Sequence, residues 1–258
     1  MVSRIRLQRI EGDPVTLHFS PDYHPRAQGV GKLVEEAHRF LAEWLGVEAH
    51  TTVSLLRREN WRHLRRAPYG YPHSSPEHST IFVPATYPPP WIDRSRALYE
   101  AAPERLQRKV CGEEDELRRQ IAAFYDLVAV HELGHLFIHH LKLALGTRWL
   151  IELIANLFAT AFFVEQRPEL AECWLSWADI QRSQDVPFQS LEAYEANYSS
   201  LSFANASYYQ GRFNRYALRL WKQHGHSIAA PLIAQFSLLP HAVDERFAKV
   251  APNFQWER

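Results

Sequence analysis

The segment His131-Glu132-Leu133-Gly134-His135 places two histidines four residues apart on either side of a glutamate. On an α-helix, such positions lie about 40° apart around the axis and about 6 Å apart along it. Both imidazoles therefore leave one face of the helix and can bind one metal ion. The carboxylate of Glu132 lies beside them, where it can act as the base for a metal-bound water.

The residues on both sides of this segment predict one long, mostly buried helix. Apolar residues dominate positions 121–130 before the segment and 136–138 after it, and Gly134 is the one glycine in the run. A glycine in a helix interior costs about 1 kcal/mol relative to alanine. We therefore expect another backbone to approach closely at Gly134, near the metal. The alternative is a core helix that carries surface histidines.

A catalytic zinc site needs a third protein ligand besides two histidines and a water. His139 cannot join the pair on one helix, because it lies about 12 Å beyond His131 along the axis. A known longer pattern with a third histidine requires glycine at position 138 and histidine at position 141. This chain has Ile138 and Leu141 at these positions, so the class of metal sites with three histidines in that pattern is excluded.

Glu152 is the better candidate for the third ligand. It opens a second helical segment, for which Gly146 ends the preceding helix and Thr147 is the expected N-cap. Asn156 lies four residues after Glu152 and shares its helix face, so it can bond the free nitrogen of a ligand histidine. The alternative for Glu152 is an ordinary salt bridge at the start of a helix.

Helix geometry limits how Glu152 can reach the two histidines. If the first helix ran straight to Leu145, its end would lie about 15 Å beyond His135 along the axis. The six residues of returning helix from Gly146 to Glu152 span only about 9 Å in the opposite direction, so Glu152 would not reach the level of His135. We therefore predict that the first helix ends or bends between His139 and Leu143, or that the second helix crosses it obliquely.

The two segments together resemble the gluzincin zinc metallopeptidases, and most closely the soluble ImmA/IrrE-like family. The residues that carry the resemblance are His131, Glu132, His135, Glu152, Ala155, Asn156, Phe158 and Ala159. It implies that His131, His135 and Glu152 bind zinc and that Glu132 is the catalytic base. It covers about residues 121–164. The chain departs from the family at Asn156, where many gluzincins have aspartate, and it carries no helix-turn-helix signature, so repressor cleavage is not supported.

Composition sets further expectations. The formal net charge is zero, which gives no overall attraction to nucleic acid or to an anionic membrane. The first residues lack the apolar stretch of a secretory signal, and the apolar segment 153–164 is too short to span a bilayer. Cys111 and Cys173 lack the spacing of a metal motif, and we expect free thiols. We therefore expect a cytoplasmic protein with neither a nucleic-acid nor a membrane partner.

The remaining sequence indicates a mixed architecture. Strands are predicted at residues 14–19, 51–56 and 80–83, and helices at 31–46, from Pro168, at 208–224 and at 228–236. Residues 68–76 and 84–90 are expected to be irregular loops. By the resemblance, the strand at 80–83 is nominated as the edge along which a peptide substrate lies. An ordinary central strand is the alternative.

Amide hydrolysis also creates an oxyanion, which zinc usually shares with a tyrosine or histidine donor. Candidates for this donor are Tyr198, Tyr208, Tyr209, His224 and His226. We choose Tyr209 among them. The alternative for Tyr209 is a packed aromatic residue on a helix.

These inferences combine into one hypothesis. The fold is expected to be α+β and zincin-like, as a single domain over residues 1–258. Residues 1–145 form an α/β half with a small mixed sheet, a backing helix and the active-site helix, and residues 146–258 form a helical half with the third ligand. The predicted function is hydrolysis of peptide bonds in a peptide or protein substrate, with one zinc per chain and Glu132-assisted attack of the zinc-bound water. The alternatives are a non-catalytic, metal-binding regulatory or interaction protein on the same frame, and a hydrolase of non-peptide amides.

Overall fold

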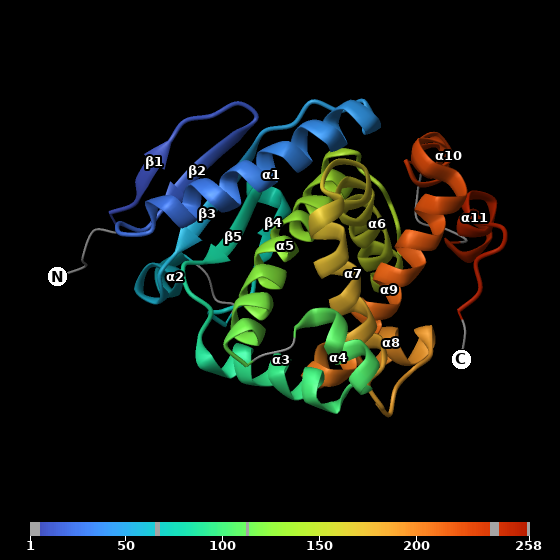
Figure 1. The fold of residues 1–258 in the computed structure, drawn as a ribbon. Coiled ribbons are helices and arrows are strands. Elements are labelled where there is room, and N and C mark those ends of the chain that lie inside the picture. The colour runs from blue at the N-terminus through green and yellow to red at the C-terminus, as the bar shows by residue number, and fades with distance from the viewer. Residues whose placement is uncertain (1–5, 65–67, 112–113, 238–242, 257–258) are drawn as a thin grey trace.

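The computed structural model describes residues 6–64, 68–111, 114–237 and 243–256. Five strands near the N-terminus form one mixed sheet (Figure 1). They are β1 (Gln8–Ile10), β2 (Val15–Phe19), β3 (Thr51–Leu56), β4 (His73–Ser75) and β5 (Thr80–Pro84). In the order β1-β2-β3-β5-β4, the inner strands β2, β3 and β5 run parallel, and the outer strands β1 and β4 are antiparallel to their neighbours.

The sheet confirms the three predicted strands and corrects one prediction. β5 lies between β3 and β4, so residues 80–83 form an inner strand and not the edge. The edge strand is β4, inside the stretch expected to be an irregular loop. Its polar sequence, His-Ser-Ser, carries no strand signal, because it is pairing with β5 that fixes this short segment.

Helices accompany the sheet along the first half of the chain. They are α1 (His24–Leu45), α2 (Arg58–Leu64), the 3₁₀ turn η1 (Pro76–His78), α3 (Pro89–Ala101), α4 (Glu104–Val110) and α5 (Glu114–His140). α1 packs on β2, and a Cβ on Gly31 would lie 2.5 Å from Leu17. The helix ends at Gly46 as expected, with a left-handed φ of 65°, but it begins earlier than predicted, with a proline in its first turn.

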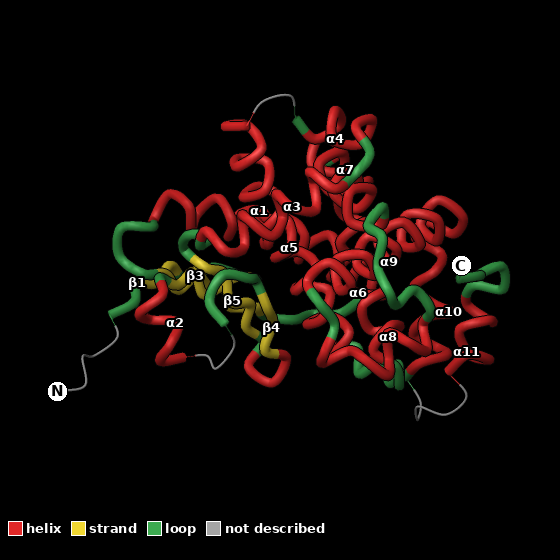
Figure 2. The backbone as a smooth tube through the Cα atoms, turned by 90° about the horizontal axis from the view of Figure 1, so that it is seen from below, coloured by secondary structure: helices red, strands yellow, loops and turns green. Residues whose placement is uncertain are grey.

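The second half is helical and gathers to one side of the sheet (Figure 2). Its elements are α6 (Arg148–Gln166), α7 (Pro168–Arg182), α8 (Leu191–Asn197), η2 (Tyr198–Ser200), α9 (Phe203–His224), η3 (Gly225–Ile228), α10 (Ala229–Phe236) and α11 (Val243–Val250). α6 packs against α5, α7 and α9, and most of its residues are buried. A helix that is apolar on all sides is stable only in such a position.

α5 ends where the geometric argument required. Its last helical residue is His140, and Lys142 then takes a left-handed φ of 53°. The turn is closed by backbone bonds from Lys142 N to His139 O (3.0 Å) and from Leu143 N to Ile138 O (3.1 Å). Thr147 is the N-cap of α6, as predicted, although its side chain makes no capping bond. The chain therefore reverses direction soon after the second histidine.

One hydrophobic core extends through both halves, from Val15 in β2 to Ala251 after α11. The α+β class predicted from the sequence is confirmed. Cys111 and Cys173 are free thiols. By length and composition alone, residues Glu116–His140 of α5 and all of α6 could cross a membrane, whereas the sequence predicts only an apolar segment at 153–164 that is too short to do so. In each helix, 78% of the apolar 18-residue stretch is buried inside the protein. Both helices therefore also fit the description of core helices in a soluble protein.

Candidate metal centre

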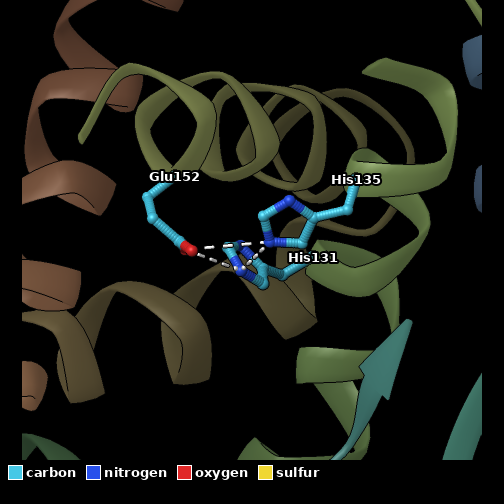
Figure 3. Close-up of side chains that lie close together, drawn as sticks. All are labelled: His131, His135 and Glu152. Atoms are coloured by element: carbon cyan, nitrogen blue, oxygen red, sulfur yellow. Dashed lines mark hydrogen bonds and ion pairs between the residues drawn. The ribbon is translucent and has the colours of Figure 1, made fainter. Parts of the chain in front are cut away.

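His131 and His135 of α5 and Glu152 of α6 point toward one another (Figure 3). The two Nε2 atoms lie 3.0 Å apart, and Glu152 Oε2 lies 3.3 Å from His131 Nε2 and 3.7 Å from His135 Nε2. His131 and Glu152 are buried, and His135 is nearly so, with 15% of its side chain exposed. The helix spacing and the reversal after His140 together bring this group into contact.

The group has the dimensions of a metal site. A tetrahedral ion with bonds of about 2.0–2.1 Å separates its ligand atoms by about 3.3 Å. The three observed separations lie close to that value, and two imidazoles with one carboxylate form an established donor set for catalytic metals. His131, His135 and Glu152 could therefore hold one metal ion.

Gly134 sets the distance between the two helices that carry the ligands. A Cβ at this position would lie 2.7 Å from the backbone oxygen of Ala155 and 2.9 Å from its Cα, closer than side-chain atoms approach a backbone. The close approach predicted from this glycine is therefore confirmed. It places Glu152, one turn before Ala155, opposite the histidine pair.

The carboxylate of Glu152 is oriented by a residue that sequence reasoning missed. Gln210 Nε2, on α9, donates to Glu152 Oε2 at 2.7 Å. Gln210 Oε1 in turn accepts a bond from Asn156 Nδ2 at 2.9 Å. Fifty-eight residues separate Gln210 from Glu152, and no local pattern marks that relation. Only the packing of α9 on α6 brings the two together.

Asn156 has a different contact from the one predicted. Its amide nitrogen donates to Glu152 O (2.8 Å) and to Gln210, and within the described residues it forms no hydrogen bond with a ligand histidine. Among those residues, His131 Nδ1 and Asn156 Oδ1 both lack a hydrogen-bond partner. Asn156 therefore acts on the site through Gln210, because it fixes the amide that holds Glu152.

Glu132 lies between the histidine pair and the edge strand β4. Ser74 donates twice to Glu132 Oε2, from its backbone nitrogen at 2.7 Å and from its hydroxyl at 2.8 Å. Since the N–H of Ser74 is directed to Glu132 and not to β5, the unpaired edge of β4 faces the metal centre. The strand thus holds the carboxylate beside the three candidate ligands.

The two carboxylates of the site have opposite pKa shifts. Burial raises the pKa of Glu132 to about 7, although His135 and Ser74 oppose the shift. Burial also acts to raise the pKa of Glu152, but His135 and the hydrogen bonds from His131 and Gln210 outweigh it and lower the pKa to about 2. Burial lowers the pKa of His135. These shifts favour an ionised Glu152 beside a neutral His135, which are the forms of these two side chains that bind metal.

Two hollows meet at the candidate metal centre. One, of about 700 Å³, extends over Ile138, Lys142 and Ile151. The other, of about 650 Å³, extends between α3, α5, α7 and α9 and has many aromatic residues in its wall. The residues common to both hollows are His73, Glu132, His135, Glu152 and Tyr198. A bound chain that enters both would therefore cross the centre.

Tyr209 is not at this centre, contrary to the prediction. Its side chain is fully buried, its hydroxyl donates to Ser190 O at 2.8 Å, and it borders neither hollow. Of the tyrosines considered, Tyr198 is the one that borders both. The nearby Glu152 and partial burial raise the pKa of Tyr198 to about 12. The sequence does not rank the five candidates, and Tyr209 lies on the long helix α9, whereas Tyr198 lies in the short turn η2 before it.

Comparisons with protein-family models, with curated proteins and with solved structures found no significant match to this chain.

Proposed function

We propose that this protein is a zinc-dependent metallopeptidase of the gluzincin type, with a zincin-like fold and with His131, His135 and Glu152 as ligands of one zinc ion. The observation that carries the proposal is the convergence of these side chains from two helices, at separations of 3.0, 3.3 and 3.7 Å, beside the buried carboxylate of Glu132. A purely structural metal site would not need this additional carboxylate, and it would use four protein ligands.

The roles of the surrounding residues follow from their positions. Zinc, when bound, would polarise the scissile carbonyl and make water a stronger nucleophile at neutral pH. Glu132, fixed by Ser74, would accept the proton of the attacking water and deliver it to the leaving nitrogen. Gln210 would keep the Glu152 carboxylate directed at the histidines. Tyr198, protonated at neutral pH, would donate a hydrogen bond to the oxyanion in place of Tyr209.

The substrate would be an extended peptide that lies along β4. An unpaired strand edge presents backbone groups to a peptide, and β4 turns that edge toward Glu132. The hollows on either side of the centre would take residues on either side of the scissile bond. The burial of α5 and α6 favours core helices over membrane spans. A cytoplasmic location and the absence of nucleic-acid partners remain expectations from the sequence, with its formal net charge of zero.

A mixed peptide library tests this proposal. We expect the zinc-loaded protein to cut peptide bonds and Glu132→Gln to abolish turnover while it keeps the metal, because glutamine fills the same space but cannot accept the proton. Cleavage products would be identified by mass spectrometry and bound zinc by elemental analysis of the same samples. Small non-peptide amides would be tested in parallel. Cleavage of these amides but not of peptides would identify a hydrolase of non-peptide amides. A zinc-loaded protein that cuts neither class of substrate would instead be a metal-binding regulatory or interaction protein.

A further inference from the structure

The hollow that lies over the end of α5 carries one unbalanced positive charge. Besides His135, Glu132 and Glu152 at its metal end, its described wall residues are His73, Ser74, Pro76, Ile138, His139, Lys142, Leu143, Ile151 and Tyr198. None of these residues away from the metal is acidic, and Lys142 carries a full positive charge at neutral pH. The two carboxylates at the metal end are engaged, Glu152 by the histidines and Gln210, and Glu132 by Ser74. The part of the hollow away from the metal therefore attracts an anion.

The side chain of Lys142 is accessible to a ligand in this hollow. Lys142 is an exposed residue of the wall, so its side chain is open to the solvent that fills the hollow. Among the described residues, its ammonium has neither a hydrogen-bond partner nor an ion-pair partner. The four-carbon stem is flexible, and the ammonium carries three N–H donors. Lys142 can therefore turn its charge and its donors to an anionic group that enters the hollow.

The backbone of Lys142 has a conformation that normally selects glycine. The bonds from Lys142 N to His139 O and from Leu143 N to Ile138 O form the pattern known as a Schellman motif, and the φ of 53° at Lys142 is left-handed. α1 ends with a glycine, Gly46, at φ 65°. A Cβ is unfavourable in this region, so lysine stabilises the turn less than glycine would. Unfavourable backbone conformations of this kind cluster at functional sites.

We propose that Lys142 binds a carboxylate of the substrate within three residues of the scissile bond, so that the enzyme prefers peptides with an acidic side chain or a free C-terminus there. The proposal rests on the proposed peptidase function. His139 lies one helical turn, about 6 Å, beyond His135, and Lys142 follows the end of α5. An extended peptide advances about 3.4 Å per residue. A carboxylate two or three residues from the metal therefore comes within reach of the long lysine side chain.

Six-residue peptides of alanine and serine test this preference. Each is acetylated and amidated and contains one glutamate or one glutamine, which is moved through all six positions. At the preferred position we expect kcat/KM to be about two- to fivefold higher for glutamate, as for other exposed ion pairs. The ratio should fall as salt is added, because salt screens exposed charges. The same peptide with a free instead of an amidated C-terminus distinguishes a terminal carboxylate from an acidic side chain.

Variants of Lys142 assign the preference to this residue. Lys142→Met should bring the ratio close to one, and Lys142→Arg should keep most of it, because only methionine removes the charge. Lys222→Met is the matched control, since Lys222 is an exposed lysine on α9 that borders neither hollow. It should leave the ratio unaltered. Equal kcat/KM for both members of every wild-type pair, or a wild-type ratio in Lys142→Met, would overturn the proposal.

Lys142→Gly tests the backbone argument in the same assay. Glycine adopts the left-handed conformation without a Cβ, so we expect the midpoint of thermal unfolding to rise by about 2–4 °C. The preference for a carboxylate should be lost in the same variant. A more stable protein that kept the full preference would contradict the role of the lysine side chain.

A binding measurement separates this proposal from the peptidase function. The glutamate and glutamine peptides, and the pair with free and amidated C-termini, would be titrated into zinc-loaded Glu132→Gln protein by NMR, with and without Lys142→Met. We expect tighter binding of the peptide with the additional carboxylate and loss of this difference in the double variant. That result without cleavage of any peptide by the wild-type protein would support the carboxylate site and refute the peptidase. Peptide cleavage with equal binding within every pair would refute the carboxylate site alone.

Discussion

At the scale of single residues, Gln210 is the contact that links α9 to the metal centre. Its amide is held by Asn156 and donates to Glu152 Oε2 at 2.7 Å. Partners of this kind contribute about 10–100-fold to metal affinity, because they fix the orientation of the ligand. We expect Gln210→Met to weaken zinc binding by about this factor. Competition with a chromophoric chelator measures the affinity.

Gln166→Met is the matched control for this variant. Gln166 lies at the exposed end of α6, so the same chemical change there should leave zinc affinity unaltered. Equal zinc affinities for Gln210→Met and the wild-type protein would show that the Glu152 carboxylate does not depend on this hydrogen bond.

At the scale of elements, the contact between α5 and α6 determines whether the three candidate ligands meet. Gly134→Ala would place a methyl group 2.7 Å from Ala155 O, and the backbone of α6 cannot yield as a side chain would. We expect a loss of about 1–3 kcal/mol in the free energy of unfolding, as in other overpacked cores. Weaker zinc binding should accompany this loss, since separating the helices moves Glu152 away from the histidines. Chemical denaturation and chelator competition measure the two effects.

Gly29→Ala separates steric overlap from the effect of alanine on a helix. A Cβ on Gly29, in α1, would contact nothing within 4 Å. Alanine should therefore stabilise α1 by up to about 1 kcal/mol and leave zinc affinity unchanged. If Gly134→Ala behaved in the same way as Gly29→Ala, the close approach of α5 and α6 would not limit the site.

At the scale of the whole molecule, the packing of α1 on α5 creates a pH-dependent stability. His38 is 1% exposed, its ring lies 5.1 Å from that of Phe137, and in the described part of the structure neither ring nitrogen has a hydrogen-bond partner. Burial lowers the pKa of His38 to about 4, with further lowering by His140 and His50 and smaller opposing effects of its own backbone and of Asp13. The folded protein therefore binds a proton at His38 only below the pH at which the unfolded chain does.

The sign of the effect follows from proton uptake. Between pH 6.5 and about 4 the unfolded state binds more protons at His38, so the free energy of unfolding falls as the pH falls. We expect His38→Leu to remove this contribution, which amounts to about 3 kcal/mol across the window. Urea denaturation at a series of pH values, in the presence of a chelator, would show the difference between variant and wild type growing toward low pH. Parallel curves of the free energy of unfolding against pH for the two proteins would contradict this expectation. His24→Leu is the control, because His24 is an exposed histidine on the same helix.

Features that depend on local geometry could be predicted from the sequence. The end of α5 near His140 followed from helix rise and the need to bring Glu152 back, and the close contact at Gly134 followed from the helix cost of glycine. Features that depend on packing between distant segments could not. β4 has no strand pattern of its own, and Gln210 reaches Glu152 only because α9 packs on α6. The choice of Tyr209 over Tyr198 failed for the same reason, since the path of the chain before α9 determines which tyrosine borders the centre.

The most direct test of the central claim is the metal content of the protein, purified without a histidine tag or added metal and measured by mass spectrometry. We predict about one zinc per chain in the wild-type protein and in Glu132→Gln, and almost none in His135→Ala, because two remaining ligands cannot complete the site. No bound zinc even after zinc is added back, or wild-type zinc affinity in His135→Ala, would contradict the assignment of His131, His135 and Glu152 as a metal centre.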